Sequence, residues 1–200
     1  LETDYPWCAD HADDLRTIFT AYTARKRTHQ VLDYDDLLLF WRGLTVSEVG
    51  DAMRDLFDHI LIDEYQDTNP IQADIVRGMC RPDTDLCAVG DDAQAIYGFR
   101  AATVANMWEF AEHFPGATRV TLEQNYRSTM PILSVANAVL TQSDEHFAKE
   151  LWSSRAHGLT PKLRTHHDEG AQSASVATAV LDARERGIDL RQQAVLFRAG

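Results

Sequence analysis

Two short apolar runs in this sequence end in clusters of acidic and amide side chains. Residues 60–62, Ile-Leu-Ile, lead directly into Asp63 and Glu64. Residues 86–89, Leu-Cys-Ala-Val, lead into a second polar cluster, formed by Gly90, Asp91, Asp92 and Gln94. One carboxylate at such a place can hold a hydrated Mg²⁺, and a neighbouring carboxylate can orient or deprotonate an attacking water. The two clusters therefore suggest one Mg²⁺-dependent site that hydrolyses phosphate esters or anhydrides.

These residues alone leave other interpretations open. An Asp-Glu pair is also typical of an acidic helix N-terminus, which the helix dipole stabilises. The carboxylates do not tell a nuclease from an enzyme that hydrolyses nucleotides. A further acidic cluster, Asp33, Asp35 and Asp36, could form a metal site, but it stands at a predicted helix start, with Asp33 as the N-cap. We favour a structural role for that cluster.

Alternating helix and strand patterns place the first two clusters at one edge of a parallel sheet. Apolar periodicity predicts helices at residues 11–29, 31–44, 51–57, 71–80, 102–113, 130–141 and 171–186. The predicted strands are residues 59–62, which we expect to be buried, and residues 86–89, 118–122, 161–166 and 193–199. Strands that alternate with helices indicate an α/β fold with parallel sheets. Ligands of such sheets bind beyond the carboxyl ends of the strands, where both clusters fall.

The composition is that of a globular protein that can bury a core, since 44% of the 200 residues are hydrophobic. The net charge of −12 argues against nucleic-acid binding as a bulk property, but all except three of the 19 basic residues are Arg, which suits a local phosphate-binding groove. Three Cys without CxxC spacing predict reduced thiols. No apolar run approaches the ~20 residues that cross a bilayer, and no leader is recognisable, so we expect a soluble, cytoplasmic protein with no membrane partner.

Three longer motifs resemble those of UvrD/Rep/PcrA-like superfamily 1 DNA helicases, in the family's order. They are ILIDEYQDTNPIQ (residues 60–72), AVGDDAQAIYGFRAA (88–102) and TLEQNYRSTMPIL (121–133). Two weaker segments, LDYDDLL and QAVLFR, extend the similarity over roughly residues 30–200. The resemblance implies a P-loop NTPase-like α/β fold with parts of two RecA-like domains, each a parallel sheet flanked by helices. We expect a helical tail of an inserted domain (1–28), part of the first RecA-like domain (29–116) and part of the second (117–200).

The same resemblance implies an ATP-dependent DNA helicase with ATP and Mg²⁺ as cofactors. Its partners would be single-stranded DNA, along which it moves 3′ to 5′, and junctions between duplex and single strands. By this resemblance Asp63 and Glu64 bind the metal, and Glu64 is also the general base. Gln94 senses the γ-phosphate, Tyr126 stacks on the adenine, and Arg127 reaches the γ-phosphate from the second domain. The alternatives are an exposed loop amide for Gln94 and a structural salt bridge for Arg127.

The resemblance also implies DNA contacts by Tyr97, Phe99, Arg100 and Arg198. Aromatic rings that stack on bases grip DNA without reading its sequence, which suits a translocase. Family members often have Trp where this chain has Phe99, so the aromatic face is kept with less stacking area. The alternatives are a core position for Phe99 and a structural role for Arg198.

The family's phosphate-binding loop and its later, C-terminal motifs are missing from these residues. The phosphate-binding loop GxxxxGK[ST] does not occur, and none of the three Lys follows a Gly. We therefore expect an internal fragment of a longer helicase that by itself neither hydrolyses ATP nor unwinds DNA. The competing hypotheses are a binding module that has lost the loop and a nuclease that uses the clustered carboxylates directly.

Overall fold

The computed structural model describes residues 5–143 and 147–197, which divide into two compact units. Unit 1 comprises residues 5–122, 143 and 147–149, and unit 2 comprises residues 123–142 and 150–197. Each unit is described by itself. None of the helices in the described ranges is long and apolar enough to cross a membrane.

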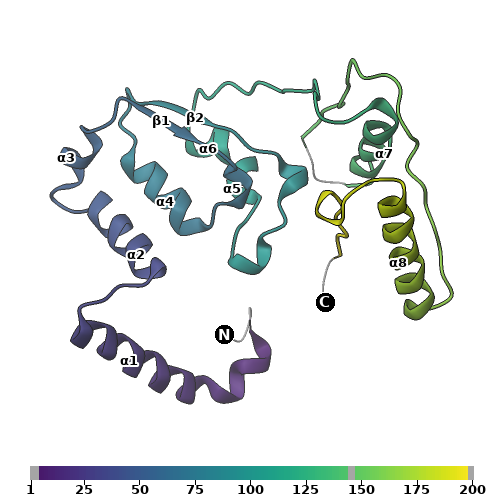
Figure 1. The fold of residues 1–200 in the computed structure, drawn as a ribbon. Coiled ribbons are helices and arrows are strands. Elements are labelled where there is room, and N and C mark those ends of the chain that lie inside the picture. The colour runs from purple at the N-terminus through teal and green to yellow at the C-terminus, as the bar shows by residue number, and fades with distance from the viewer. Residues whose placement is uncertain (1–4, 144–146, 198–200) are drawn as a thin grey trace. The chain divides into compact units, whose positions relative to one another are not determined.

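Unit 1 contains all of the regular sheet and most of the helices (Figure 1). Its α-helices are α1 (Ala12–His29), α2 (Tyr34–Thr45), α3 (Gly50–Arg54), α4 (Pro70–Met79), α5 (Ala105–Trp108) and α6 (Phe110–His113). Its strands are β1 (His59–Ile62) and β2 (Asp85–Ala88). Short 3₁₀ turns are η1 (Pro6–His11), η2 (Tyr65–Asp67), η3 (Asp92–Gln94) and η4 (Gly98–Arg100).

Capping residues fix the starts of α2 and α4. Asp33 caps α2, which confirms the predicted N-cap. Its side chain accepts a hydrogen bond from the Asp36 N–H, and the Asp36 side chain accepts one from the Asp33 N–H. Lys26 of α1 lies 2.7 Å from Asp33 and 2.6 Å from Asp36, and the two hydrogen bonds raise the pKa of the lysine. This supports a structural role for the acidic cluster. Asn69 and Gln72 form the equivalent box at the start of α4.

The two strands pair in parallel, with His59 opposite Asp85 and Ile62 opposite Ala88. Exposure alternates along both strands, and Leu61 is 80% exposed, so the prediction of a buried strand at residues 59–62 was wrong. A strand with one covered face alternates in this way. The buried apolar side chains of unit 1, among the described residues, are Tyr65, Ala73 and Ile75.

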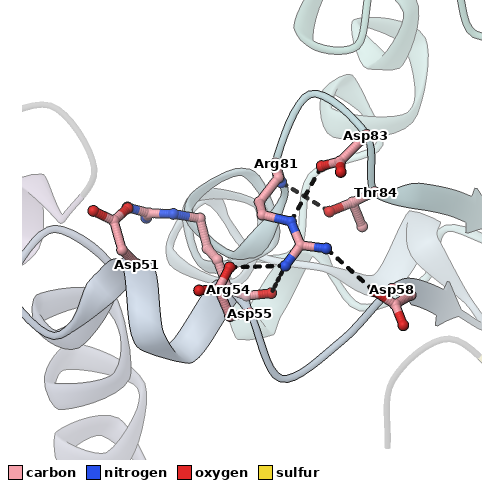
Figure 2. Close-up of polar contacts among 7 residues, drawn as sticks. All are labelled: Asp51, Arg54, Asp55, Asp58, Arg81, Asp83 and Thr84. Carbon is pink, nitrogen blue, oxygen red and sulfur yellow. Dashed lines mark hydrogen bonds and ion pairs between the residues drawn. The ribbon is translucent and has the colours of Figure 1, made fainter.

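A single arginine ties together the chain segments at the amino end of the sheet (Figure 2). The guanidinium of Arg81 donates to Asp55 Oδ1 at 2.9 Å, to Asp83 Oδ1 at 3.1 Å and to Asp58 Oδ1 at 3.2 Å. It also donates to the carbonyl oxygen of Arg54. These bonds fix the segment before β1 against the segment before β2.

Unit 2 contains α7 (Met130–Leu140), α8 (Glu169–Glu185) and η5 (Leu190–Gln192). Its only pairing of strand type, among the described residues, is one parallel bridge between Gln124 and Trp152. Asn137 of α7 holds the chain near this bridge, because its amide donates to the Leu151 carbonyl at 2.9 Å and accepts from the Leu151 N–H at 3.1 Å.

Several predicted elements differ in the structure. Residues 118–122, 161–166 and 193–197 are not strands, and residues 198–199 of the last one lie outside the described residues. These segments find no ladder partner in the described ranges, and their apolar side chains are exposed, as with Leu163 at 94%. The predicted helix 102–113 is divided at Glu109 into α5 and α6, and the predicted helix 51–57 is the shorter α3.

Candidate functional site

The carboxyl ends of β1 and β2 lie side by side, because Ile62 and Ala88 are register partners. The pairing continues one step beyond the strands, where Val89 N–H donates to the Ile62 carbonyl at 2.8 Å and Tyr65 N–H donates to the Val89 carbonyl at 2.9 Å. The chain therefore turns immediately after Asp63 and Glu64 while still bonded to its neighbour strand.

Glu64 lies at this turn in the left-handed region, with φ 52° and ψ 45°. A non-glycine residue there costs about 1 kcal/mol relative to the right-handed helical region. Its N–H donates to Asp63 Oδ1 at 3.0 Å, which binds the two acidic residues into one local unit. Tyr65, the next residue, is 2% exposed and packs edge-on against Phe110, with ring centroids 5.3 Å apart. The strained turn is thus held by the core directly behind it.

A buried amide joins the two polar clusters. Gln66 is 1% exposed, its Nε2 donates to Glu64 Oε2 at 2.7 Å, and its Oε1 accepts from the Asp91 N–H at 2.9 Å. Gly90 provides the room for this contact, since a Cβ at that position would lie 2.7 Å from Gln66 Oε1. The prediction that the clusters meet at one edge of the sheet is confirmed for Glu64 and Asp91.

The loop that follows β2 is held by further bonds. Gln94 Nε2 donates to Asp91 Oδ2 at 2.7 Å, and the Ala93 N–H donates to Asp91 Oδ1 at 3.1 Å. Lys149 forms ion pairs with Asp91 and, at 2.6 Å, with Asp92. Burial alone would raise the pKa of Asp91, but the bonds from Gln94 and Lys149 outweigh it and lower the pKa below its ordinary value. Asp91 is therefore ionised at neutral pH.

Asp63 and Glu64 differ from Asp91 and Asp92, which form ion pairs with Lys149. Both are exposed, and no cation forms an ion pair with either of them among the residues the structure describes. One Asp63 oxygen is engaged by the turn and the other has no hydrogen bond within the described residues. No group of three or more metal-ligating side chains occurs in the described ranges. Mg²⁺ is commonly held by only one or two carboxylates together with waters and substrate phosphates, so Asp63 and Glu64 fit that ion.

The predicted DNA-contacting residues follow this loop. Tyr97 and Phe99 have ring centroids 5.9 Å apart at an interplanar angle of 49°. Phe99 is 79% exposed, so the alternative of a core position is wrong. Arg100 ends η4, but its side chain lies outside what the structure describes, and Arg198 lies outside the described residues altogether.

The two predicted nucleotide-binding residues of unit 2 lie on a turn before α7. Asn125 Oδ1 accepts the N–H groups of Arg127 and Ser128 at 2.9 and 2.7 Å, and this bonding shapes the turn. Tyr126 is 76% exposed, with its hydroxyl donating to Gln124 Oε1 at 2.8 Å. Arg127 is exposed and has no carboxylate partner in the described part of the chain, so the expected alternative of a structural salt bridge is not observed.

Sequence reasoning did not identify two residues of this site, Gln66 and Lys149. Gln66 lies inside the first of the three longer motifs but carries no spacing signal of its own. Lys149 lies 58 residues from Asp91, and its one sequence signal is that lysine occurs only three times in the chain.

Two family models match the chain: the UvrD/REP helicase N-terminal domain over residues 6–115 and the UvrD-like helicase C-terminal domain over residues 120–200. The chain is 33% identical over 198 residues to the ATP-dependent DNA helicase PcrA of Staphylococcus aureus, which covers 98% of this chain and 26% of that protein. It is 38% identical over 173 residues to PcrA of Leuconostoc citreum, covering 83% of this chain and 23% of the relative. A probable DNA helicase II homologue of Rickettsia conorii is 36% identical over 188 residues, covering 92% and 29%.

The chain thus spans about a quarter of the length of the curated relatives that it matches. The first family model alone covers more than half of the 200 residues, and the second covers most of the remainder. The chain therefore belongs to the UvrD/REP helicase family.

Proposed function

We propose that this chain is part of an ATP-dependent DNA helicase that moves 3′ to 5′ along single-stranded DNA and opens duplexes at junctions. The proposal is supported by family membership and by relatives named as ATP-dependent DNA helicases. The single observation that carries it is the buried Gln66 bridge, which joins Glu64 to the loop of Gln94. Such a bridge suits a site in which a base and a phosphate sensor act on one nucleotide.

The proposed chemistry is hydrolysis of the terminal phosphate of ATP. Asp63, together with Glu64, would hold Mg²⁺, which neutralises phosphate charge when it is bound. Glu64 accepts a proton from the attacking water as general base, and its Gln66 partner holds the carboxylate at the strand end. Gln94 contacts the γ-phosphate, and the hydrogen bond that its Nε2 donates to Asp91 holds the amide in position.

Further residues of the proposed helicase contact the nucleotide and the DNA. Tyr126 stacks on the adenine, and Arg127 stabilises charge on the γ-phosphate. Tyr97, Phe99, Arg100 and Arg198 contact single-stranded DNA, a role that the exposed Phe99 ring suits.

We further propose the division suggested by the family motifs. Residues 1–28 are a helical tail of an inserted domain, residues 29–116 part of a first RecA-like domain and residues 117–200 part of a second. The 200 residues alone are inactive as an ATPase and helicase, because they contain no GxxxxGK[ST] segment. We also propose that the protein works in the cytoplasm.

The test is ATP turnover by the full-length protein, with and without single-stranded DNA, beside its Glu64→Gln variant. Loss of a general base predicts a fall in kcat of at least about 100-fold, with the melting temperature unchanged. Glu112→Gln, at an exposed glutamate of α6, is the matched control and should retain full turnover. A Glu64→Gln variant as active as the control would refute the assignment.

The same preparations separate the competing hypotheses. A nuclease would cleave DNA in Mg²⁺ without ATP, and Asp63→Asn would abolish that cleavage. A binding module would bind DNA and show no ATP turnover at all. Either result, obtained with the full-length protein, would replace the helicase proposal.

A further inference from the structure

The loop after β2 carries two adjacent carboxylates that are removed from water to different degrees. Asp92 has a side chain only 3% exposed, and Asp91 has a side chain 33% exposed. Two neighbouring carboxylates at such burial repel each other and lose hydration, which is costly unless a cation compensates them. Lys149 supplies that cation, and its own side chain is 10% exposed.

The segment that carries Lys149 is itself fixed to this loop. The Phe147 N–H donates to Asp92 Oδ2 at 2.7 Å, so one Asp92 oxygen is bonded by the backbone and the other by Lys149. The guanidinium of Arg119 lies 4.8 Å from the centre of the Phe147 ring. Burial alone would lower the pKa of Lys149, but the bonds to Asp91 and Asp92 outweigh it and raise the pKa, so the ammonium keeps its charge.

Asp91, Asp92 and Lys149 together form a cluster that we call the clasp. Asp91 connects the clasp to the proposed hydrolysis site. Its Oδ1 binds Lys149 while its Oδ2 accepts from Gln94 Nε2, and its N–H donates to Gln66, the partner of Glu64. Lys149 is therefore the one cation, among the described residues, that holds the Asp91 carboxylate to which Gln94 donates. Removal of the ammonium leaves two like charges side by side, and the loop relaxes by separating them.

We infer that Lys149 is a positioning residue for the proposed hydrolysis site, acting through Asp91 on the side chain of Gln94. The inference rests on the proposed function, because Gln94 is the residue whose placement it explains. It assigns a role to a segment that belongs to none of the three longer motifs. A residue that acts through Gln94 should change kcat and leave nucleotide binding unchanged.

The first experiment compares full-length Lys149→Met, Lys149→Arg and the control Lys162→Met for DNA-stimulated ATP turnover. Lys162 is exposed in unit 2 and has no hydrogen bond or ion pair within the described residues. We expect Lys149→Met to lower kcat about 10-fold with the KM for ATP within about twofold, since a small misplacement of a catalytic group has effects of this order. Lys149→Arg keeps the charge and should recover most of the rate. Equal rates for Lys149→Met and Lys162→Met would overturn the inference.

The second experiment separates positioning from simple loss of stability by repeating Lys149→Met in a Gln94→Ala background. If Lys149 acts through Gln94, the second substitution should change kcat by less than about twofold there. A further 10-fold loss in that background would show an effect independent of Gln94 and would overturn the inference. Should Lys149→Met fail to fold, Lys149→Gln carries the same cycle with a smaller expected loss of about threefold. An inactive wild type would instead refute the proposed function, and the inference with it.

Discussion

At the amino end of the β1–β2 sheet one guanidinium, that of Arg81, binds three carboxylates, whereas at the carboxyl end Asp63 and Glu64 have no cation partner in the described ranges. Both ends join the same two strands. At the amino end the join is made by charge, and at the carboxyl end it is made by the neutral, buried amide of Gln66. An amide can hold Glu64 without neutralising it, so the carboxylate stays available as a base and as a ligand for a cation.

This comparison teaches how one small sheet separates stability from chemistry. A carboxylate bound to arginine is ionised and occupied, and it serves only to hold the chain together. A carboxylate bound to a glutamine N–H is also oriented, but it can still accept a proton. The four predictions below test this division, beginning with the largest expected effect.

Replacing Gln66 by Leu should damage both function and fold. The change leaves Glu64 Oε2 and the Asp91 N–H without their buried partner, which typically costs about 1–3 kcal/mol of unfolding free energy. We expect kcat for ATP to fall about 100-fold in the full-length protein, because Glu64 and the loop that carries Gln94 both lose the side chain that holds them. Urea denaturation and steady-state kinetics measure the two effects. Gln172→Leu, at an exposed glutamine of α8, is the control, and a Gln66→Leu protein that matches it would break the comparison.

Gly90→Ala should act on the same bridge from the other side. The new Cβ would lie 2.7 Å from Gln66 Oε1 and 3.2 Å from Met107 Sδ, so the amide has to shift. We expect kcat to fall about 10-fold with a modest loss of stability. Gly43→Ala in α2, where a Cβ meets nothing within 4 Å, should leave kcat unchanged and stabilise the helix by about 0.5–1 kcal/mol. Unchanged kinetics for Gly90→Ala would show that the position of Gln66 does not matter.

Arg81→Met should affect the fold and spare the chemistry. The three carboxylates would lose their shared partner, and the melting temperature should fall by about 5 °C. Turnover at 25 °C should stay within about twofold, because the site lies at the other end of the strands. Arg16→Met, which breaks a fully exposed pair with Asp13, should change neither quantity. Loss of turnover by folded Arg81→Met would contradict the proposed division between the two ends.

The smallest effect concerns pH. The folded pKa of Asp91 is lowered below 3.8, so its stabilising contribution is complete above that value and is lost as pH falls through the folded pKa. The pKa of Lys149 is raised above 10.5, so its contribution is complete below that value and is lost only as pH rises through the folded pKa. The difference in unfolding free energy between wild type and Lys149→Met should therefore be constant from pH 7 to pH 9, because the carboxylates of the variant, which lack their cation, take up protons only at lower pH. A slope within that window would mean that the clasp is not fully ionised.

Local chemistry accounts for the parts of the fold that the sequence predicted well. Asp33 caps α2, Pro70 stands at the first position of α4, and the predicted strand 59–62 has the observed bounds. Each of these features depends on residues within a few positions of one another. The remaining predicted strands depend on hydrogen bonds to distant segments, and residues 118–122 of unit 1 find none in the described part of the chain.

The site shows the same limit. The juxtaposition of Glu64 and Asp91 follows from parallel pairing of two predicted strands, so sequence reasoning could reach it. Lys149 lies 58 residues from Asp91 in the sequence, and the intervening residues include a helix of the other unit. Sequence periodicity does not predict such a contact. The roles of Tyr126 and Arg127 remain predictions from the family resemblance.

The course of the backbone has a practical consequence for anyone who wishes to dissect this protein. Residues 143 and 147–149 belong to unit 1, although they stand in the sequence between two stretches of unit 2, residues 123–142 and 150–197. The polypeptide consequently crosses from one unit to the other three times, and no single cleavage can release either unit intact. A truncation after Leu122 would discard the lysine that neutralises Asp91 and Asp92, so a shortened first unit would expose or distort its own sensor loop. Faithful separation of the halves would require grafting residues 143–149 back by a new linker.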